Sequence, residues 1–420
     1  MKKKRWISAL CAAMLLTACV APASAADTFS GSSGGRSSSV LGSGGIQTET
    51  AAIGQTASVS VSSSEFALSL LQGIREPGKS SLISPASAEF ALGMAANGAD
   101  GETLAQMEQV LGGDRDTLNS QYLGRRNSLE QSGVKVANSV WMNTSYGGIP
   151  QGNSIWDAYA GTLGQYYGAQ LRAEDLGTEE GIGQINAWVR ENTDGMIPEI
   201  LDSPDGEMLL CLVNALAMDA QWLRPYTASD VTEGTFTNAA GEQQQAQYLN
   251  STETFFEVDG ASGIRKRYKD SALAFVAILP DGSLDEYMDG LTAEQLAQAL
   301  NGESSELAQV SLPKFKVEQS SELNEVLASM GMADAFDQEK ANLSAITGAS
   351  NLYLSKVVQK TTLEVNEDGT KAAAATAIGI NTTSMQIPPK EKIEFNRPFL
   401  FAVVDTQSGS PIFLGTVETL

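Results

Sequence analysis

The segment that decides the fold runs from Glu364 to Gln386 and reads EVNEDGTKAAAATAIGINTTSMQ. One interpretation is a surface helix after the Asp368-Gly369 turn, because alanine has the highest helix propensity. The residues after the alanine run argue against a helix, since residues 376–386 are rich in β-branched side chains, include a glycine and carry no charge. We therefore expect a long exposed loop with strand character.

Alternate positions of this segment differ in chemistry. A strand places successive side chains on opposite faces of a sheet, and the face that enters a packed interior must be small or apolar. This division predicts a segment that can be inserted into a sheet, which a helix would not require. The uncharged set is Thr370, Ala372, Ala374, Thr376, Ile378 and Ile380, whereas the set Lys371, Ala373, Ala375, Ala377 and Gly379 holds the one charged residue.

The sequence on either side of the loop segment contains five further motifs in a fixed order. With the loop, they resemble the serpin family from about residue 60 to the end of the chain. The motifs are SLISPASAEFALGMAANGADGETLAQ at 81–106, INAWVRENTDGMIPEI at 185–200, LVNALAMDAQW at 212–222, LPKFKVEQSSELNEVLASMGMADAF at 312–336 and FNRPFLFAVVDTQSGSPIFLG at 395–415.

The resemblance implies an α+β fold with three β-sheets, eight to nine helices and an exposed reactive-centre loop. We see no boundary that would divide residues 57–420, so we expect one serpin domain. Two long apolar runs, 134–142 and 208–217, suit strands of a central sheet covered on both faces. Further strands are expected at 273–279, 310–317, 352–358, 399–404 and 412–417, and helices at 64–74, 87–96, 102–111, 179–192, 292–300 and 321–330.

For function, the resemblance implies an inhibitor of serine proteases rather than an enzyme. Inhibitory members offer the loop as bait, hold the protease as an acyl-enzyme and insert the cut loop into the large sheet as a new strand. The hinge that must insert carries no proline and no bulky charged residue on its inward face, which favours inhibition over the alternative of a non-inhibitory binding or chaperone-like serpin. The hinge residues are Glu367, Gly369, Thr370, Ala372, Ala373, Ala374, Ala375 and Thr376.

The reactive bond has two candidate positions. Family spacing from Gly369 places it between Thr383 and Ser384. The sequence Met385-Gln386-Ile387-Pro388-Pro389 instead resembles the Met-x-Ile-Pro-Pro found around the cleaved bond of some animal members. Either residue before the bond suits an elastase-like or subtilisin-like protease, because neither is the Arg or Lys that a trypsin-like pocket binds.

A second group of positions matches the polar cluster where the family's sheet opens. Ser84, Ser87 and Asn214 match that cluster, and Trp222 and Glu367 match the place where insertion begins. Gln359 is a departure, because it stands where the family commonly has histidine. Glutamine can both donate and accept hydrogen bonds, as neutral imidazole does, but it does not titrate. For stability alone, a set of buried polar groups and a core tryptophan would account for these residues.

Composition excludes several classes of function. The 420 residues include 27 Lys plus Arg, 50 Asp plus Glu, three Cys and no His. Ser/His/Asp and Cys/His catalysis and histidine-containing zinc sites are therefore excluded, and we expect no metal and no cofactor. A carboxylate-based hydrolase stays open in principle, although no pair of acidic residues is singled out. The net charge of −23 argues against nucleic acid as a partner, and we expect a monomer.

The N-terminus has the pattern of an export signal. Residues 1–18 place Lys and Arg ahead of a short apolar run. Cleavage after Ala25 competes with cleavage before Cys19, because residues 16–19 resemble the box where bacterial lipoproteins are cut and acylated. Residues 19–56 have the Ser/Gly-rich composition of a tether. We expect an exported protein, extracellular or held at the cell surface by a lipid on Cys19, and a buried thiol at Cys211.

Overall fold

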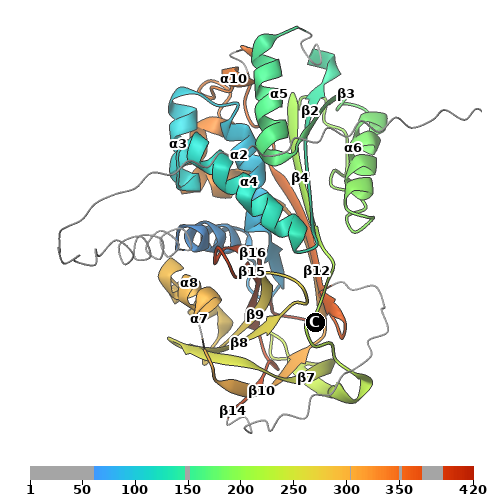
Figure 1. Ribbon diagram of the computed structural model, residues 1–420, viewed down its shortest axis with the longest axis vertical. Helices are drawn as coiled ribbons and strands as arrows, with labels where there is room; N and C mark the ends of the chain where they lie inside the picture. The colour runs from blue at the N-terminus through green and yellow to red at the C-terminus, as the bar shows by residue number, and fades with distance from the viewer. Residues whose placement is uncertain (1–60, 147–151, 303, 350–351, 371–390) are drawn as a thin grey trace, which may run out of the picture. The chain divides into compact units, whose positions relative to one another are not determined.

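The computed structural model describes residues 61–146, 152–302, 304–349, 352–370 and 391–420. All of them belong to one compact unit, Glu49–Leu420. The described strands form three sheets of nine, four and three strands, with helices packed against them (Figure 1). The α+β fold expected from the sequence is confirmed.

The largest sheet contains the strands that the sequence marks most clearly. β9 (Leu273–Pro280), β15 (Phe399–Asp405) and β16 (Pro411–Val417) are adjacent, antiparallel and buried at every residue. Continuous apolar runs of this kind belong to strands covered on both faces. The order is β1 (Ser81–Ile83), β16, β15, β9, β8 (Ala261–Arg267), β7 (Gln243–Val258), β10 (Leu307–Pro313) and β14 (Glu391–Glu394), with β6 (Val231–Thr237) also paired to β7.

The three-stranded sheet is built on the two long apolar runs. β2 (Val134–Asn143) pairs antiparallel with β4 (Leu210–Met218) along nine residue pairs, and β3 (Gln170–Glu174) pairs parallel with β2. One face packs in the main core, which includes residues of α2 (Pro85–Ala96). The other face packs in a second core with α6 (Glu179–Asn192), where Cys211 and Trp141 lie. Both the covering of two faces and the burial of Cys211 agree with the sequence.

The four-stranded sheet lies beside β4 and has the order β11 (Phe315–Glu322), β12 (Val358–Val365), β13 (Gly369–Thr370), β5 (Ala220–Gln221). β4 and β12 run side by side (Figure 1), yet the described residues form no ladder between them. The chain passes from β4 to β5 through Asp219, so the two sheets are joined at β5. We call the unpaired space between β4 and β12 the slot.

The helices surround these sheets. Residues 61–74 are helical. α2 begins with Pro85 as its first residue, and the Ser84 hydroxyl accepts from the Ser87 N–H as its N-cap. The expected eight to nine helices correspond, among the described residues, to this first helix, α2, α3 (Gly101–Leu111), α4 (Arg115–Gln131), α5 (Ser154–Tyr167), α6, α7 (Leu284–Gly290) and α8 (Ala293–Asn301), with single turns at α9 (Asn324–Leu327) and α10 (Ser344–Thr347).

Three expected elements were wrong in their bounds. The helix over 321–330 begins only at Asn324, because Ser321 and Glu322 still pair with β12, and after α9 it continues as a π-helical turn, Ala328–Met332, in which Gly331 has φ 122°. The run 310–317 is divided at Lys314 into β10 and β11, which lie in different sheets. The strand over 352–358 instead begins at Val358, although Leu352, Leu354 and Val357 are buried. Helices α4, α5 and α7 and strands β6 to β8 were not expected.

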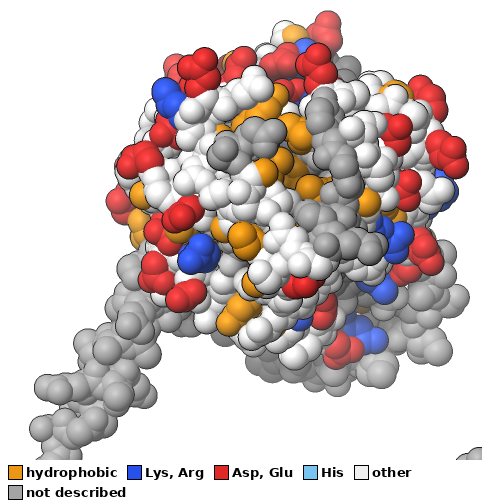
Figure 2. Space-filling view, turned by 90° about the horizontal axis from the view of Figure 1, so that it is seen from above, with side chains coloured by type: hydrophobic (Ala, Val, Ile, Leu, Met, Phe, Trp, Pro, Cys, Tyr) orange, Lys and Arg blue, Asp and Glu red, His pale blue; other side chains and the backbone are white. Residues whose placement is uncertain are grey.

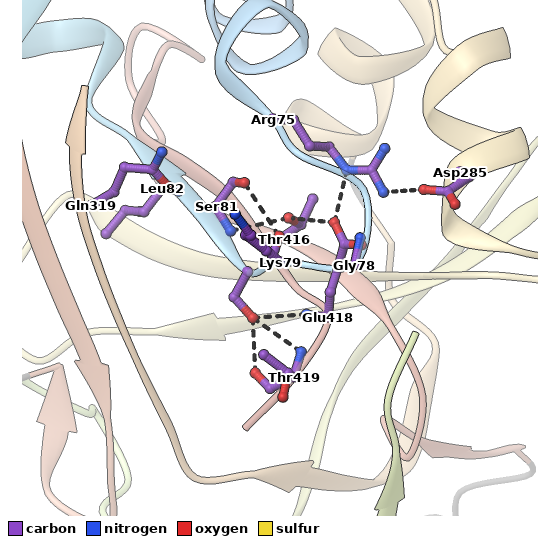
Figure 3. A network of polar contacts seen from close by, with 11 residues as sticks. Arg75, Gly78, Lys79, Ser81, Leu82, Asp285, Gln319, Thr416, Glu418 and Thr419 are labelled. Atoms are coloured by element: carbon purple, nitrogen blue, oxygen red, sulfur yellow. Dashed lines mark hydrogen bonds and ion pairs between the residues drawn. The ribbon is translucent and has the colours of Figure 1, made fainter. Parts of the chain in front are cut away.

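A buried polar network ties the end of β16 to the first helix (Figure 3). The Glu418 carboxylate accepts from Arg75 Nε at 2.8 Å, from the Gly78 N–H at 2.6 Å and from the Thr416 hydroxyl at 3.1 Å. Arg75 also forms an ion pair with Asp285 of α7. Glu418 is 1% exposed, and these donors offset the cost of burying its carboxylate. None of the helices in the described ranges is long and apolar enough to cross a membrane.

Candidate functional site: the hinge and the slot

The hinge begins in a tight turn after β12. The Asn366 side-chain oxygen accepts from the N–H groups of Asp368 at 3.0 Å and Gly369 at 3.1 Å, which reverses the chain. Gly369 and Thr370 then form β13 between β12 and β5, antiparallel to both. The first two residues after the turn thus already occupy one end of the slot.

Gly369 is required there by a close approach of backbones. A Cβ atom at this position would lie 2.0 Å from the carbonyl oxygen of Ala220 and 2.9 Å from the carbonyl carbon. No side chain fits at that distance, and the backbone of β5 cannot move without leaving β13. The glycine therefore allows the hinge to enter between the strands.

Thr370 points into the interior. It is 2% exposed, and its hydroxyl lies 2.5 Å from the hydroxyl of Tyr268, which is also buried. Burial raises the pKa of Tyr268, so the phenol stays protonated and either hydroxyl can donate. The uncharged set of alternate loop residues begins with this inward-facing position.

Trp222 holds the turn that precedes the hinge. Its indole N–H donates to the carbonyl of Asn366 at 2.9 Å, and its backbone N–H donates to the carbonyl of Asp368 at 2.9 Å. The ring is fully buried and stacks on Tyr268 with centroids 4.6 Å apart. Trp222 therefore connects β5, the turn and the phenol that meets Thr370.

Glu367 is the outer charge of this turn. Its side chain is 35% exposed and forms an ion pair with Lys314. Burial acts to raise the pKa of Glu367, but the hydrogen bond from Lys314 and the positive charge of that ammonium leave the pKa below its usual range. The pair joins the turn to the residue between β10 and β11.

A buried lysine lies beneath the tryptophan. Lys266 is 2% exposed, its Nζ lies 2.5 Å from the Glu253 carboxylate, and it lies 4.3 Å from the centroid of the Tyr226 ring. Burial lowers the pKa of Lys266, against the attraction of Glu253, which acts to raise it. Sequence reasoning missed Lys266, Glu253 and Tyr268, because no motif distinguishes them, whereas Lys314 lies inside the LPKFK motif.

Ser84 and Gln359 lock β12 to the start of α2. The Gln359 side-chain oxygen accepts from the Ser84 N–H at 2.8 Å, and its Nε2 donates to the Ser84 carbonyl at 2.7 Å. The Ser84 hydroxyl donates to the Ile412 carbonyl at 2.8 Å. Ser87 completes the group, because its backbone N–H donates to the Ser84 hydroxyl oxygen. Glutamine meets both backbone groups at once.

Asn214 belongs to the opposite wall of the slot. Its Nδ2 donates to the Asn138 side-chain oxygen at 2.6 Å, and Asn138 donates to the carbonyl of Tyr167 at 2.8 Å. Among the described residues, Asn214 forms no hydrogen bond with Ser84 or Gln359. The cluster expected from the sequence is therefore two half-clusters, one on β4 and one on β12, that line the same pocket.

Several expected site residues lie outside the described residues. They are the hinge residues Ala372, Ala373, Ala374, Ala375 and Thr376, the reactive-bond candidates Thr383, Ser384, Met385 and Gln386, and the lipidation candidate Cys19.

Comparison with known proteins places this geometry in a family. The family model for serpins, described as serine protease inhibitors, matches residues 61–420. The chain is 31% identical over 380 residues to the leukocyte elastase inhibitor of Homo sapiens, across 85% of this chain and 98% of that protein. It is 31% identical over 399 residues to serpin B10 of Sorex araneus, again across 85% and 98%.

A solved structure agrees. The native state of the thermophilic serpin tengpin superposes with a TM-score of 0.77 at 36% identity, covering 86% of this chain and 94% of that one. The range that the family model matches, residues 61–420, contains the turn, the hinge and both walls of the slot. The chain belongs to the serpin family.

Proposed function

We propose that this protein inhibits a serine protease of the elastase-like or subtilisin-like class as a suicide substrate. The observation that carries the proposal is β13. Gly369 and Thr370 already pair between β12 and β5, with Thr370 facing inward, and the slot continues from that point between two strands that have no ladder between them. The slot between β4 and β12 could therefore accept the loop after cleavage.

The chemistry comes from the target. The protease serine attacks the carbonyl carbon before the reactive bond, the peptide bond breaks, the new amine leaves with a proton, and the loop remains as an ester on the protease. Insertion of about a dozen residues at roughly 1 kcal/mol per backbone hydrogen bond supplies on the order of 10 kcal/mol. That is comparable with the whole stability of a domain and can drive a mechanical step.

The target class rests on the residue before the reactive bond. We place the bond at Thr383-Ser384, with Met385-Gln386 as the alternative, and neither offers a basic side chain. The relatives named leukocyte elastase inhibitor support an elastase-like target.

We further propose that the protein is bacterial and exported, and that a lipid on Cys19 holds it at the cell surface. Figure 2 shows acidic side chains around one face of the molecule, with fewer basic side chains among them. Such a surface repels phosphate groups, so we propose no nucleic acid as a partner. Replacing Cys19 by Ala should release the protein from the membrane fraction, and unchanged retention would contradict the lipid anchor.

The main test is incubation with pancreatic elastase, followed by denaturing gel electrophoresis and intact-mass analysis. We expect an SDS-resistant adduct and a released fragment that begins at Ser384. Complete cleavage without an adduct at every protease ratio would sink the inhibitory proposal in favour of a binding serpin. A fragment that begins at Gln386 would instead identify Met385-Gln386 as the reactive bond.

A further inference from the structure

A cavity of about 390 Å³ lies between α4, the start of the first helix and the turn that joins β15 to β16. We call it the α4 cavity. It is separate from the slot, because none of its lining residues also lines the two pockets between β4 and β12. What binds in the α4 cavity therefore does not depend on loop insertion.

Three charged side chains line the α4 cavity. They are Glu89 of α2, Arg125 of α4 and Asp405 at the end of β15. Arg125 and Glu89 form an ion pair, and their side chains are only 10% and 9% exposed. Asp405 is 2% exposed. The other lining residues are uncharged at neutral pH, so one positive and two negative charges leave a net charge of −1 around the cavity.

The positive charge is held in place by partners other than Asp405. Arg125 Nη2 donates to the Pro411 carbonyl at 2.9 Å, and Nη1 pairs with Glu89. Because the guanidinium is planar and rigid, these two partners fix its orientation. Burial lowers the pKa of Arg125 to about 10, against the attraction of Asp405, so Arg125 stays a cation at neutral pH.

Both carboxylates keep acceptor capacity that the described part of the chain does not use. Arg125 pairs with Oε2 of Glu89, and Oε1 accepts from no residue that the structure describes. Oδ1 of Asp405 accepts from the Gln407 N–H at 2.9 Å, whereas Oδ2 is 3.5 Å from the Ser128 hydroxyl, which is too long for a strong hydrogen bond. A buried carboxylate is costly without donors. A ligand that brings donors and a positive charge would meet this need.

The rest of the lining suits a hydroxylated compound. Six of the lining residues are serines, and a hydroxyl can both donate and accept. Gly124 also lines the cavity from the middle of α4, and a Cβ atom there would meet no atom within 4 Å. Glycine weakens a helix interior, and at this position it leaves the cavity open beside Arg125.

We propose that the α4 cavity binds a small hydroxylated organic ammonium ion, such as an amino sugar. The ammonium group donates to Oδ2 of Asp405 and brings the net charge around the cavity to zero. A hydroxyl of the ligand donates to Oε1 of Glu89, and the other hydroxyls meet the serines. An uncharged sugar would leave the negative charge uncompensated, and a carboxylate would add a third one, so both should bind more weakly.

The test is calorimetric titration of the full-length protein with four sugars of similar size. The buffer contains no amine and is held at about pH 6, where a primary amine is protonated. Glucosamine carries the ammonium group, N-acetylglucosamine and glucose are uncharged, and glucuronate is an anion. We expect glucosamine to bind more tightly than either uncharged sugar by about tenfold or more, and glucuronate to bind most weakly.

Three variants locate the site. Gly124→Leu should abolish binding, because its side chain would enter the cavity. Gly164→Leu is the matched control, since Gly164 lies in α5 outside the cavity and a Cβ there also meets no atom within 4 Å. Asp405→Asn keeps the acceptor for the Gln407 N–H but removes one negative charge, so the preference for glucosamine over glucose should disappear. Thermal unfolding of each variant checks that it is folded.

Several results would overturn the proposal. Glucosamine binding that survives Gly124→Leu would place the site elsewhere. Tighter binding of glucuronate than of glucosamine would identify an anion site at Arg125 instead. Equal binding of glucosamine and glucose, or no binding of glucosamine at about 10 mM, would show that the cavity does not select an ammonium ion. None of these measurements uses a protease, so their failure leaves the proposed inhibition untouched.

Discussion

The Thr370 hydroxyl and the Tyr268 hydroxyl lie 2.5 Å apart in the interior, at the end of the slot. Tyr268 stacks on Trp222, and Trp222 donates to the carbonyl of Asn366 in the turn before the hinge. The first inward-facing hinge residue is therefore held by β5, by the residue after β8 and by the turn. The first two residues of the strand that we propose to insert are thus already paired in this structure.

Replacing Thr370 by Arg should convert the inhibitor into a substrate. A guanidinium at this position would have to be buried beside Tyr268 without a carboxylate partner, which is strongly unfavourable. We expect elastase to cleave the variant and to form no SDS-resistant adduct. Lys371→Arg is the matched control, because it places a guanidinium at the next residue, which belongs to the set of alternate positions expected to face outward. A Thr370→Arg protein that traps elastase as well as Lys371→Arg does would contradict the inward position.

Replacing Gly369 by Ala should expel β13 from the slot. The added Cβ would lie 2.0 Å from the Ala220 carbonyl oxygen, and φ at Gly369 is not positive, so the clash and not the backbone conformation is the cause. We expect a native stability lower by about 2–3 kcal/mol in urea unfolding and fewer adducts per cleaved loop.

Gly183→Ala, in the middle of α6, is the control for that change. A Cβ there meets no atom within 4 Å, and alanine is favoured over glycine in a helix by about 1 kcal/mol. Gly369→Ala should therefore lower the free energy of unfolding, and Gly183→Ala should raise it. Equal stabilities of the two variants would show that the backbone of β5 can move to accommodate the added Cβ.

Gln359→Glu should make stability depend on pH near neutrality. Glutamine accepts from the Ser84 N–H and donates to the Ser84 carbonyl, and a glutamate can do both only when protonated. Its folded pKa would rise above the unfolded value of about 4.3. Stability is then present below the unfolded pKa and lost as pH rises through the folded one. We expect the deficit relative to the natural protein to grow by about 2–3 kcal/mol between pH 5 and pH 7.5. An unchanged deficit would contradict the two-bond geometry.

The two acidic partners of Arg75 should differ in importance. Glu418 is 1% exposed and accepts from three donors, whereas the Asp285 side chain is 56% exposed. Breaking a buried pair leaves an uncompensated charge, so Glu418→Gln should cost about 3 kcal/mol. Asp285→Asn should cost less than about 1 kcal/mol, because exposed pairs contribute little. Thermal unfolding of both variants measures the difference, and equal costs would contradict this reading of the network.

Much of the fold follows from local sequence. The buried strands β9, β15 and β16 are continuous apolar runs, and α2 has Ser84 and Pro85 at its start, so each is specified by its own residues. β7 was missed because its pattern is largely polar and half-exposed along sixteen residues, and it is held by its neighbours β6, β8 and β10. The division of 310–317 at Lys314 depends on which sheet each half joins, which no local pattern encodes.

The site shows the same division. Ser84, Ser87, Asn214, Gln359 and Trp222 could be named from motifs. Their grouping could not, because Asn214 and Gln359 lie on opposite walls and join different partners. Tyr268 and Lys266 carry no signal, since a tyrosine or lysine at the end of a strand is ordinary until tertiary contacts bury it.

Alkaline pH should destabilise the protein through the buried thiol of Cys211. Burial raises the pKa of Cys211 from 9.0 to about 12. A group with a raised folded pKa contributes stability that is complete below its unfolded pKa and is lost as pH rises toward the folded value. The window is therefore about pH 9 to 12. Cys211→Ala removes this titration, so the stability of the natural protein relative to the variant should fall by about 2 kcal/mol between pH 8 and pH 10.5.

Urea unfolding of both proteins at these two pH values measures that difference. Comparing it with the same difference at pH 7 corrects for the cavity that alanine leaves, since the cavity cost does not titrate. Between pH 6 and 8 the sequence has no histidine to titrate, so the difference should be flat there. A constant difference from pH 7 to pH 10.5 would show that the thiol reaches solvent, and the second core around α6 would then be open at β4.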